Sequence, residues 1–336
     1  FFFKQKTAYE IRNCDWSSDV CSSDLTGRGT WCCKVRRGLF LRGFGMFKGT
    51  YTALVTPFRN GKVDDKAFAE LIERQIAAGI EGIVPVGTTG ESPTLNMAEH
   101  ARVIELAVQV ARKRIQVVAG TGSNSTAEAI ELSTGAQKAK ADALLLVAPY
   151  YNKPSPEGMF QHFRAIARET DLPIMLYSVP GRCAVEITVE TVARLAKECP
   201  AIRSIKEAGG KPERVDAIRA VVPPDFEILS GDDALTVEFM KRGAVGVVSV
   251  ASNLIPAEVK ALVDAGLRKD WKSAEELDRK YAAVFRDLFV ESNPAPVKAA
   301  MAAKGWLADE LRLPLVPISE PSRKKLFATL QQAGLN

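Results

Sequence analysis

From Met46 onward, short apolar runs alternate with longer stretches in which apolar residues recur at helical spacing. Eight of the short runs have the length and the aliphatic content of buried strands. They are TALV from Thr52, IVPV from Ile83, IQVV from Ile115, ALLLV from Ala143, PIMLY from Pro173, IRSI from Ile202, FEIL from Phe226 and VGVV from Val245. This alternation predicts an α/β protein with a parallel sheet covered by helices.

Polar residues with helix-capping potential mark where three of the intervening helices begin. The pairs are Asn96 with Glu99, Ser125 with Glu128, and Ser155 before Pro156. The first two have the spacing of a capping box, and the third places a hydroxyl before a proline at the first helical position. The chain therefore has the helical crossovers that consecutive parallel strands require.

Eight strands joined by right-handed crossovers close most simply into a (β/α)8 TIM barrel. A doubly wound open sheet has the same alternation and stays an alternative at this point. After the eighth strand the pattern is helical only, with a break at Asn293-Pro294. We expect a catalytic barrel over residues 46–255 and a C-terminal helical domain over 256–336.

Residues 1–45 differ from the rest of the chain. They lack a starting Met, helical or strand periodicity, and the apolar core of a signal peptide. The segment resembles a translated sequencing adapter, so we expect Met46 to be the natural start and residues 1–45 to lie outside the fold. Four of the six cysteines fall in this segment, which leaves Cys183 and Cys199. Two thiols are typical of a reducing cytoplasm rather than of a disulfide scaffold.

Composition excludes several classes of function. Of the 336 residues, 46% are hydrophobic and 25% are charged, and no apolar run approaches the length of a membrane helix. Residues 1–45 carry eight Lys/Arg and four Asp/Glu, so the remaining chain is nearly neutral, with 37 against 36. This balance argues against a nucleic-acid surface. With only His100 and His162 in the chain, we also expect no histidine-rich metal site.

In a barrel of this kind the active site lies where the strands end, so the residues just after each strand are the informative ones. They are rich in hydroxyl groups and glycines, and they include an amine and a guanidinium. These residues are Gly87–Glu91, Gly120–Ser123, Pro149–Asn152, Tyr177–Arg182, Lys206 and Ser230–Asp233.

Each of these residues also has a structural interpretation. Lys206 could extend to solvent at a strand end, and Arg182 could be a solvated loop charge. The threonines of Gly87–Gly90 could cap a helix, and Tyr150-Tyr151 could pack at the rim. For Asp232-Asp233 the structural interpretation is favoured, with a cap followed by a first-turn acid that interacts with the helix dipole.

The combination indicates a more specific chemistry than its members do. A lysine withdrawn from water presents a free amine near neutral pH, as a Schiff-base nucleophile requires. Nearby hydroxyl and N–H groups bind the carboxylate of a keto acid, a phenol transfers protons, and an arginine binds a second carboxylate. This chemistry needs no metal and no organic cofactor.

Five motifs resemble, in order and spacing, the dihydrodipicolinate synthase family of pyruvate-dependent class I lyases. They are GTTGES from Gly87, PYYN from Pro149, YSVPGR from Tyr177, IKEA from Ile205 and SGDD from Ser230. The similarity extends over Met46 to Asn336 and includes NPAPVKAA near the C-terminus. It implies a barrel with a C-terminal helical domain.

The resemblance also implies roles for individual residues. Lys206 would form the imine with pyruvate, Thr89 would hold the pyruvate carboxylate, and Tyr177 would donate protons. Thr88 and Tyr151 would complete a proton relay, with Tyr151 inserted from a neighbouring subunit. A homotetramer built as a dimer of dimers is the expected assembly.

The second substrate and the pocket walls follow from the same resemblance. Arg182 would bind the carboxylate of L-aspartate 4-semialdehyde, and Gly231 and Val248 would line the pyruvate pocket. The product would enter lysine and diaminopimelate synthesis. Ser178 and Cys183 depart from the residues common in the family, Asn and Thr or Gly.

Some members of the family bind lysine as a feedback inhibitor at a subunit interface. By alignment that site would comprise Ser92, Pro93, Met97, His100, Asn124, Glu128 and Tyr150. Met97 replaces a histidine that inhibited relatives carry, so we expect weak-to-moderate inhibition.

Two other functions remain open. N-acetylneuraminate lyase and keto-deoxy-sugar-acid aldolases share the barrel and the lysine, but Arg182 favours a substrate with a carboxylate over a polyhydroxy one. The chain could also be a non-catalytic barrel that binds a keto acid, since a fold alone does not establish activity.

Overall fold

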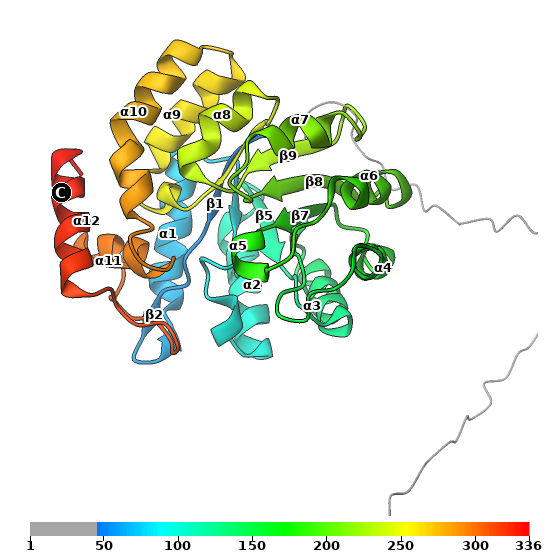
Figure 1. Ribbon diagram of the computed structural model, residues 1–336. Coiled ribbons are helices and arrows are strands. Elements are labelled where there is room, and N and C mark those ends of the chain that lie inside the picture. Colours follow the sequence, from blue (N-terminus) through cyan, green and yellow to red (C-terminus); the bar gives the residue numbers. More distant parts are fainter. Residues whose placement is uncertain (1–45, 336) are drawn as a thin grey trace, which may run out of the picture. The chain divides into compact units, whose positions relative to one another are not determined.

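The computed structural model describes residues 46–335, and these form a closed barrel of eight parallel strands in the order β1-β10-β9-β8-β7-β6-β5-β4 (Figure 1). The barrel strands are β1 Gly49–Ala53, β4 Gly82–Val84, β5 Gln116–Gly120, β6 Ala143–Val147, β7 Ile174–Ser178, β8 Ile202–Glu207, β9 Glu227–Ser230 and β10 Gly246–Ser249. A short antiparallel pair, β2 Phe58–Arg59 and β3 Lys62–Val63, follows β1. The closed sheet confirms the predicted TIM barrel and rules out the open one.

Helices follow the strands and cover the outside of the barrel (Figure 1). The α-helices are α1 Asp65–Ala77, α2 Met97–Ala111, α3 Thr126–Lys138, α4 Pro156–Arg168, α5 Pro180–Cys183, α6 Val189–Glu198, α7 Glu213–Arg219, α8 Thr236–Lys241, α9 Pro256–Leu267, α10 Trp271–Asp287, α11 Ala295–Ala303 and α12 Glu320–Gln332. Three 3-10 helices, η1 Ser92–Thr94, η2 Asp233–Leu235 and η3 Ala251–Asn253, lie after strands of the barrel.

The predicted helix starts are confirmed with one correction. Asn96 and Glu99 form the reciprocal capping box at α2, and the Ser155 hydroxyl accepts from the Gly158 N–H at α4. Ser125 caps α3, but the Glu128 carboxylate does not return to the cap. It accepts a hydrogen bond from the Ser123 hydroxyl at 2.5 Å, because the preceding loop presents that donor nearby.

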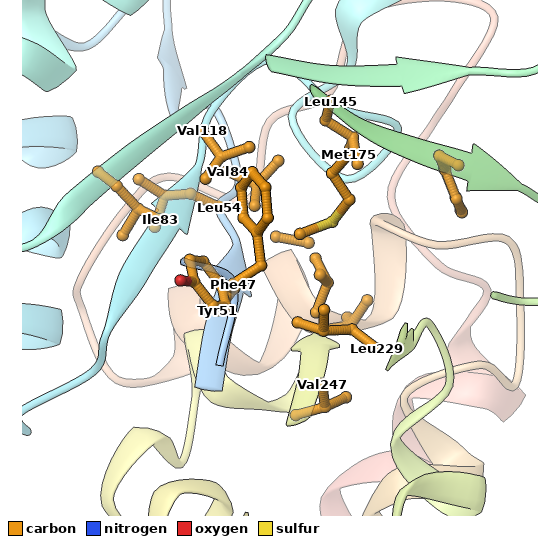
Figure 2. Close-up of a cluster of buried hydrophobic side chains, with 14 of the residues drawn as sticks. Phe47, Tyr51, Leu54, Ile83, Val84, Val118, Leu145, Met175, Leu229 and Val247 are labelled. Atoms are coloured by element: carbon orange, nitrogen blue, oxygen red, sulfur yellow. The ribbon is translucent and has the colours of Figure 1, made fainter. Parts of the chain in front are cut away.

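The barrel encloses apolar side chains contributed by strands all around it. Figure 2 shows Phe47 and Tyr51 in one cluster with residues of the opposite strands, such as Met175 and Leu229. Phe47 precedes β1, is fully buried, and donates its backbone N–H to the Glu227 carboxylate at the start of β9. It therefore closes the end of the barrel where the strands begin, and the opposite end is left for the site.

The C-terminal helices add a layer on one side of the barrel (Figure 1). α9 packs against β1 and β10, and α10 packs against α9 and α12. Because α9 covers barrel strands, it belongs with the barrel rather than with the helical domain that was expected to begin at residue 256. The helical appendage proper consists of α10, α11 and α12, with α11 in contact with η3 and α12.

The prediction for residues 1–45, and with it four of the six cysteines, lies outside the described residues. Cys183 and Cys199 are both buried with free thiols. Among residues 46–335, no helix combines the length and the apolar character needed to cross a membrane.

Candidate active site

Lys206 and Tyr177 lie side by side at the C-terminal ends of two neighbouring strands. They are register partners between β8 and β7, and the Lys206 Nζ lies 4.2 Å from the centre of the Tyr177 ring. Only 5% of Lys206 and 6% of Tyr177 are exposed. The interpretation of Lys206 as a strand-end lysine that reaches solvent is therefore wrong.

Burial changes the protonation of the Lys206 amine. Loss of hydration lowers its pKa from 10.5 to about 7, the Asp233 carboxylate opposes this shift, and the Arg182 guanidinium adds to it. A substantial fraction of the amine is therefore neutral and nucleophilic near pH 7. The next residue, Glu207, is also fully buried, and it forms an ion pair with Arg214 at 3.1 Å.

The Tyr177 phenol is held in its protonated form. Burial raises its pKa to about 12, while Arg182 and a hydrogen bond with the Thr88 hydroxyl act in the opposite direction. Thr88 is partly buried beside the phenol. The pair provides a hydroxyl chain through which a proton can be moved to or from a group on Lys206.

Thr89 is 3% exposed, and its hydroxyl oxygen accepts a hydrogen bond from the Asn293 Nδ2 at 2.9 Å. Its neighbour Glu91 has a φ of 55° and forms a fully buried ion pair with Lys298 of α11, at 2.6 Å. The loop that carries both threonines is thus attached to the C-terminal helices at two points. Neither Asn293 nor Lys298 was assigned a role from the sequence, although both fall within the NPAPVKAA motif.

Gly231 leaves room for the lysine side chain. A Cβ at this position would lie 2.7 Å from the Ala208 Cβ and 3.0 Å from the Lys206 Cε. Any larger residue would therefore displace the lysine or the backbone that follows it. Val248 is fully buried in β10, which pairs with β9, the strand that ends one residue before Gly231.

Asp232 and Asp233 have different roles. Asp232 caps η2, as the sequence predicts, by accepting from the Ala234 N–H. Asp233 does stand in the first turn of η2, as predicted, but it is buried rather than exposed. It is 3% exposed, and its Oδ2 accepts from the Val250 and Ala251 N–H groups at 3.0 and 2.9 Å. The loop after β10 thereby turns this carboxylate inward, close enough to Lys206 to raise the lysine pKa.

Arg182 lies at the exposed rim in α5, and its Nη2 donates to the Asn293 main-chain oxygen at 3.3 Å. A pocket of about 240 Å³ opens beside it. Among the residues that line this pocket are Thr88, Tyr150, Tyr177, Arg182 and Cys183. The structure therefore brings the Tyr177 phenol, the Thr88 hydroxyl and the Arg182 guanidinium to one opening.

The two positions that depart from the family pattern are both buried. Ser178 accepts from the Ile187 N–H at 3.4 Å and so supports the backbone after β7. Cys183 lines the pocket and donates its thiol proton to the Ala148 carbonyl at 3.2 Å. Burial raises the pKa of this thiol to about 11 against the effect of Arg182, so it stays protonated.

Tyr151 does not join the other predicted catalytic residues within one chain. It is 89% exposed, and its φ of 72° lies in the left-handed region, which is unfavourable for a large aromatic residue. Tyr150 is less exposed and lines the pocket. A group from elsewhere would be needed to cover Tyr151.

The residues predicted for inhibitor binding are spread over two places. Ser92 and Tyr150 line the same pocket as Tyr177. His100 is buried and lines a separate cavity of about 260 Å³ between α2 and α3, together with Met97. The Asn124 main-chain oxygen accepts from the Asn152 side chain, and Glu128 binds Ser123 as described above.

Over the described range, no group of three His, Cys, Asp or Glu side chains could hold a metal ion.

The comparisons with known proteins point to one family. A model of the dihydrodipicolinate synthetase family matches residues 46–333. The 4-hydroxy-tetrahydrodipicolinate synthase of Pelobacter propionicus is 49% identical over 290 residues, which cover 86% of this chain and 100% of that protein.

Solved structures agree with this similarity. The 4-hydroxy-tetrahydrodipicolinate synthase of Methylacidiphilum fumariolicum is 53% identical, with a TM-score of 0.85 over 85% of this chain and 96% of that one. A dihydrodipicolinate synthase of Acinetobacter baumannii, solved as a complex with pyruvate, is 44% identical with a TM-score of 0.84 over 86% and 99%. The similarity covers nearly all of both solved chains.

Proposed function

The chain belongs to the dihydrodipicolinate synthetase family, and from that membership we propose that it condenses pyruvate with L-aspartate 4-semialdehyde, the 4-hydroxy-tetrahydrodipicolinate synthase reaction. This reaction makes it a lyase of lysine and diaminopimelate biosynthesis. The observation that carries the proposal is the buried amine of Lys206, with a pKa of about 7, beside the protonated phenol of Tyr177.

The first half of the reaction uses Lys206, Tyr177 and the two threonines. The neutral lysine amine attacks the pyruvate ketone, water leaves, and a protonated imine forms. Tyr177 and Thr88 supply and accept the protons of these steps, and Thr89 holds the pyruvate carboxylate. The imine draws electrons from the pyruvate methyl group, which loses a proton to give an enamine. The covalent imine takes the place of a cofactor.

The second half of the reaction depends on Arg182. Its guanidinium binds the carboxylate of aspartate semialdehyde and holds the aldehyde carbon within reach of the enamine. Arg182 is exposed at the pocket rim, as an entrance residue should be. A sugar-acid lyase would have neutral hydrogen-bonding groups here, and a non-catalytic barrel would have no use for the lysine and phenol pair.

The exposed Tyr151 supports an oligomeric active unit. We infer that a second copy of the chain covers Tyr151 and places it in the neighbour's proton relay, within a dimer of dimers in the cytoplasm. The mass of the assembly in solution tests this proposal. A monomer with full turnover would contradict it.

Lysine is the proposed inhibitor of this enzyme, bound by Ser92, His100, Asn124, Glu128 and Tyr150. Because Met97 stands where inhibited relatives have a histidine, the expected inhibition is weak to moderate. Unchanged turnover at millimolar lysine would overturn this part of the proposal.

The overall reaction is tested by supplying both substrates and coupling the product to a reductase. Turnover with pyruvate and aspartate semialdehyde supports the synthase. Cleavage of N-acetylneuraminate or of a keto-deoxy sugar acid, without condensation of the semialdehyde, would favour the related lyases instead.

A further inference from the structure

Asn293 contacts both of the groups that the proposed reaction uses to bind carboxylates. Its Nδ2 donates to the Thr89 Oγ1 at 2.9 Å, and its main-chain oxygen accepts from the Arg182 Nη2 at 3.3 Å. Asn293 is 5% exposed and lies just before α11, far from both partners in the sequence. A residue of the helical appendage thus reaches into the barrel mouth.

The direction of the first hydrogen bond determines what the Thr89 hydroxyl can do. A threonine hydroxyl has one proton to donate and two lone pairs that accept. The Asn293 amide N–H occupies one lone pair, so the proton of the hydroxyl remains available. Among residues 46–335, Thr89 Oγ1 takes part in this one side-chain hydrogen bond, as its acceptor.

We propose that Asn293 is a positioning residue that turns the Thr89 hydroxyl proton toward the carboxylate of the keto acid. The inference rests on the proposed role of Thr89 as the carboxylate-binding residue. A carboxylate accepts hydrogen bonds and is repelled by lone pairs, so a hydroxyl whose proton is turned away from Asn293 binds it better than a freely rotating one.

The surroundings fix the backbone at Asn293, while its buried side-chain oxygen has no hydrogen-bond partner among the described residues. Its main-chain contact with Arg182 is independent of the side chain, and α11 is fixed further along by the buried pair of Lys298 with Glu91. The same helix start therefore adjoins the binding groups for both substrates. Changing the amide alone should affect pyruvate and leave the main-chain support of Arg182 intact.

Asn293→Asp reverses the hydrogen bond while keeping the shape of the side chain. An aspartate can only accept, so the Thr89 hydroxyl would donate to it and present its lone pairs to pyruvate. The readout is the pyruvate concentration that half-saturates the trapping of the imine by borohydride. We expect this concentration to rise about tenfold or more, with turnover at saturating pyruvate much less affected.

A double-mutant cycle separates hydroxyl orientation from a general loss of packing. Asn293→Leu removes the donor without adding charge and should raise the half-saturating concentration less than Asn293→Asp does. In a Thr89→Val background, where no hydroxyl remains, Asn293→Leu should have almost no further effect. If Asn293→Asp does not fold, as judged by circular dichroism, this cycle alone decides.

Two results would overturn the inference. One is an Asn293→Asp enzyme that binds pyruvate as well as the unchanged enzyme does. That result would mean that the Asn293 side chain already accepts a hydrogen bond from Thr89 in the unchanged enzyme. The other is an equal effect of Asn293→Leu with and without the Thr89 hydroxyl. Failure of the proposed function would look different, because the unchanged enzyme itself would form no adduct with pyruvate.

Discussion

Lys298 and Glu91 form an ion pair at 2.6 Å in which neither side chain is exposed to solvent. Lys298 also donates to the Thr56 main-chain oxygen, and the backbone N–H of Arg312 donates to the second Glu91 oxygen. The pair joins α11 to the loop that carries Thr88 and Thr89. It therefore links the helical appendage to the geometry of the active site.

Removing one member of this pair should strongly destabilise the protein. Lys298→Met leaves the Glu91 carboxylate buried without its cation, and we expect the free energy of unfolding to fall by about 3–5 kcal/mol. Urea unfolding measures this change. The double variant Lys298→Met/Glu91→Gln should recover much of the loss, because no charge is then buried. A loss below about 1 kcal/mol for the single variant would contradict the assigned burial.

The rate of imine formation should depend on pH through Lys206. The folded-state pKa of about 7 lies below the ordinary 10.5, so the neutral amine predominates above pH 7 and declines below it. The initial rate of borohydride trapping with pyruvate should rise about tenfold per pH unit below 7 and level off above it. A trapping rate that keeps rising until about pH 10 would show that the Lys206 amine is hydrated.

Removing the charge of Asp233 tests whether nearby charges influence the Lys206 pKa. Within residues 46–335, the charges of Asp233 and Arg182 act on the Lys206 amine, and the Tyr177 ring lies against it. Because Asp233 raises the lysine pKa, Asp233→Asn should shift the pH dependence of the trapping rate to lower pH. The side-chain oxygen of the asparagine can still accept from the Val250 and Ala251 amides. An unchanged pH dependence of the trapping rate in a folded variant would exclude this role of Asp233.

Gly231→Ala should impair the reaction through steric contact alone. The added methyl group would meet the Ala208 Cβ at 2.7 Å and the Lys206 Cε at 3.0 Å, so the lysine must shift. We expect imine formation to slow by about tenfold or more, as small displacements of catalytic groups do. Gly135→Ala in α3 is the control, since a Cβ there meets nothing within 4 Å. Equal rates in both variants would contradict the close fit.

Arg182→Ala should affect the reactions of the two substrates differently. Without the guanidinium, the pyruvate adduct on Lys206 should still form, while kcat/KM for aspartate semialdehyde should fall by roughly 10- to 100-fold. Arg182→Lys keeps the charge but not the paired N–H groups, so it should restore only part of the loss. Equal loss of adduct and turnover would contradict an entrance role for this residue.

Several features could be predicted from the sequence because they depend on local pattern. The apolar runs locate the strands, and parallel strands bring the residues after them to one end of the barrel. Lys206, Tyr177 and Arg182 were found in this way. The capping box of Asn96 and Glu99 could be predicted for the same reason, because its two residues are only three positions apart in the sequence.

Other features depend on contacts that no local pattern reveals. Asn293 and Thr89 are 204 residues apart, and Lys298 and Glu91 are 207 apart. Asp233 looks like a first-turn acid in sequence, and only the backbone amides after β10 direct it toward Lys206. The contacts of Asn293, Lys298 and Asp233 arise from tertiary packing, so the local sequence pattern does not reveal them.

The proposed reaction requires Lys206 to be the nucleophile that forms an imine with pyruvate. The most direct test incubates the protein with pyruvate and borohydride and maps the modified peptide by mass spectrometry. We expect one added carboxyethyl group per chain, on Lys206, and none in Lys206→Ala. A chain that gains no mass, or gains it on another lysine, would contradict this role of Lys206.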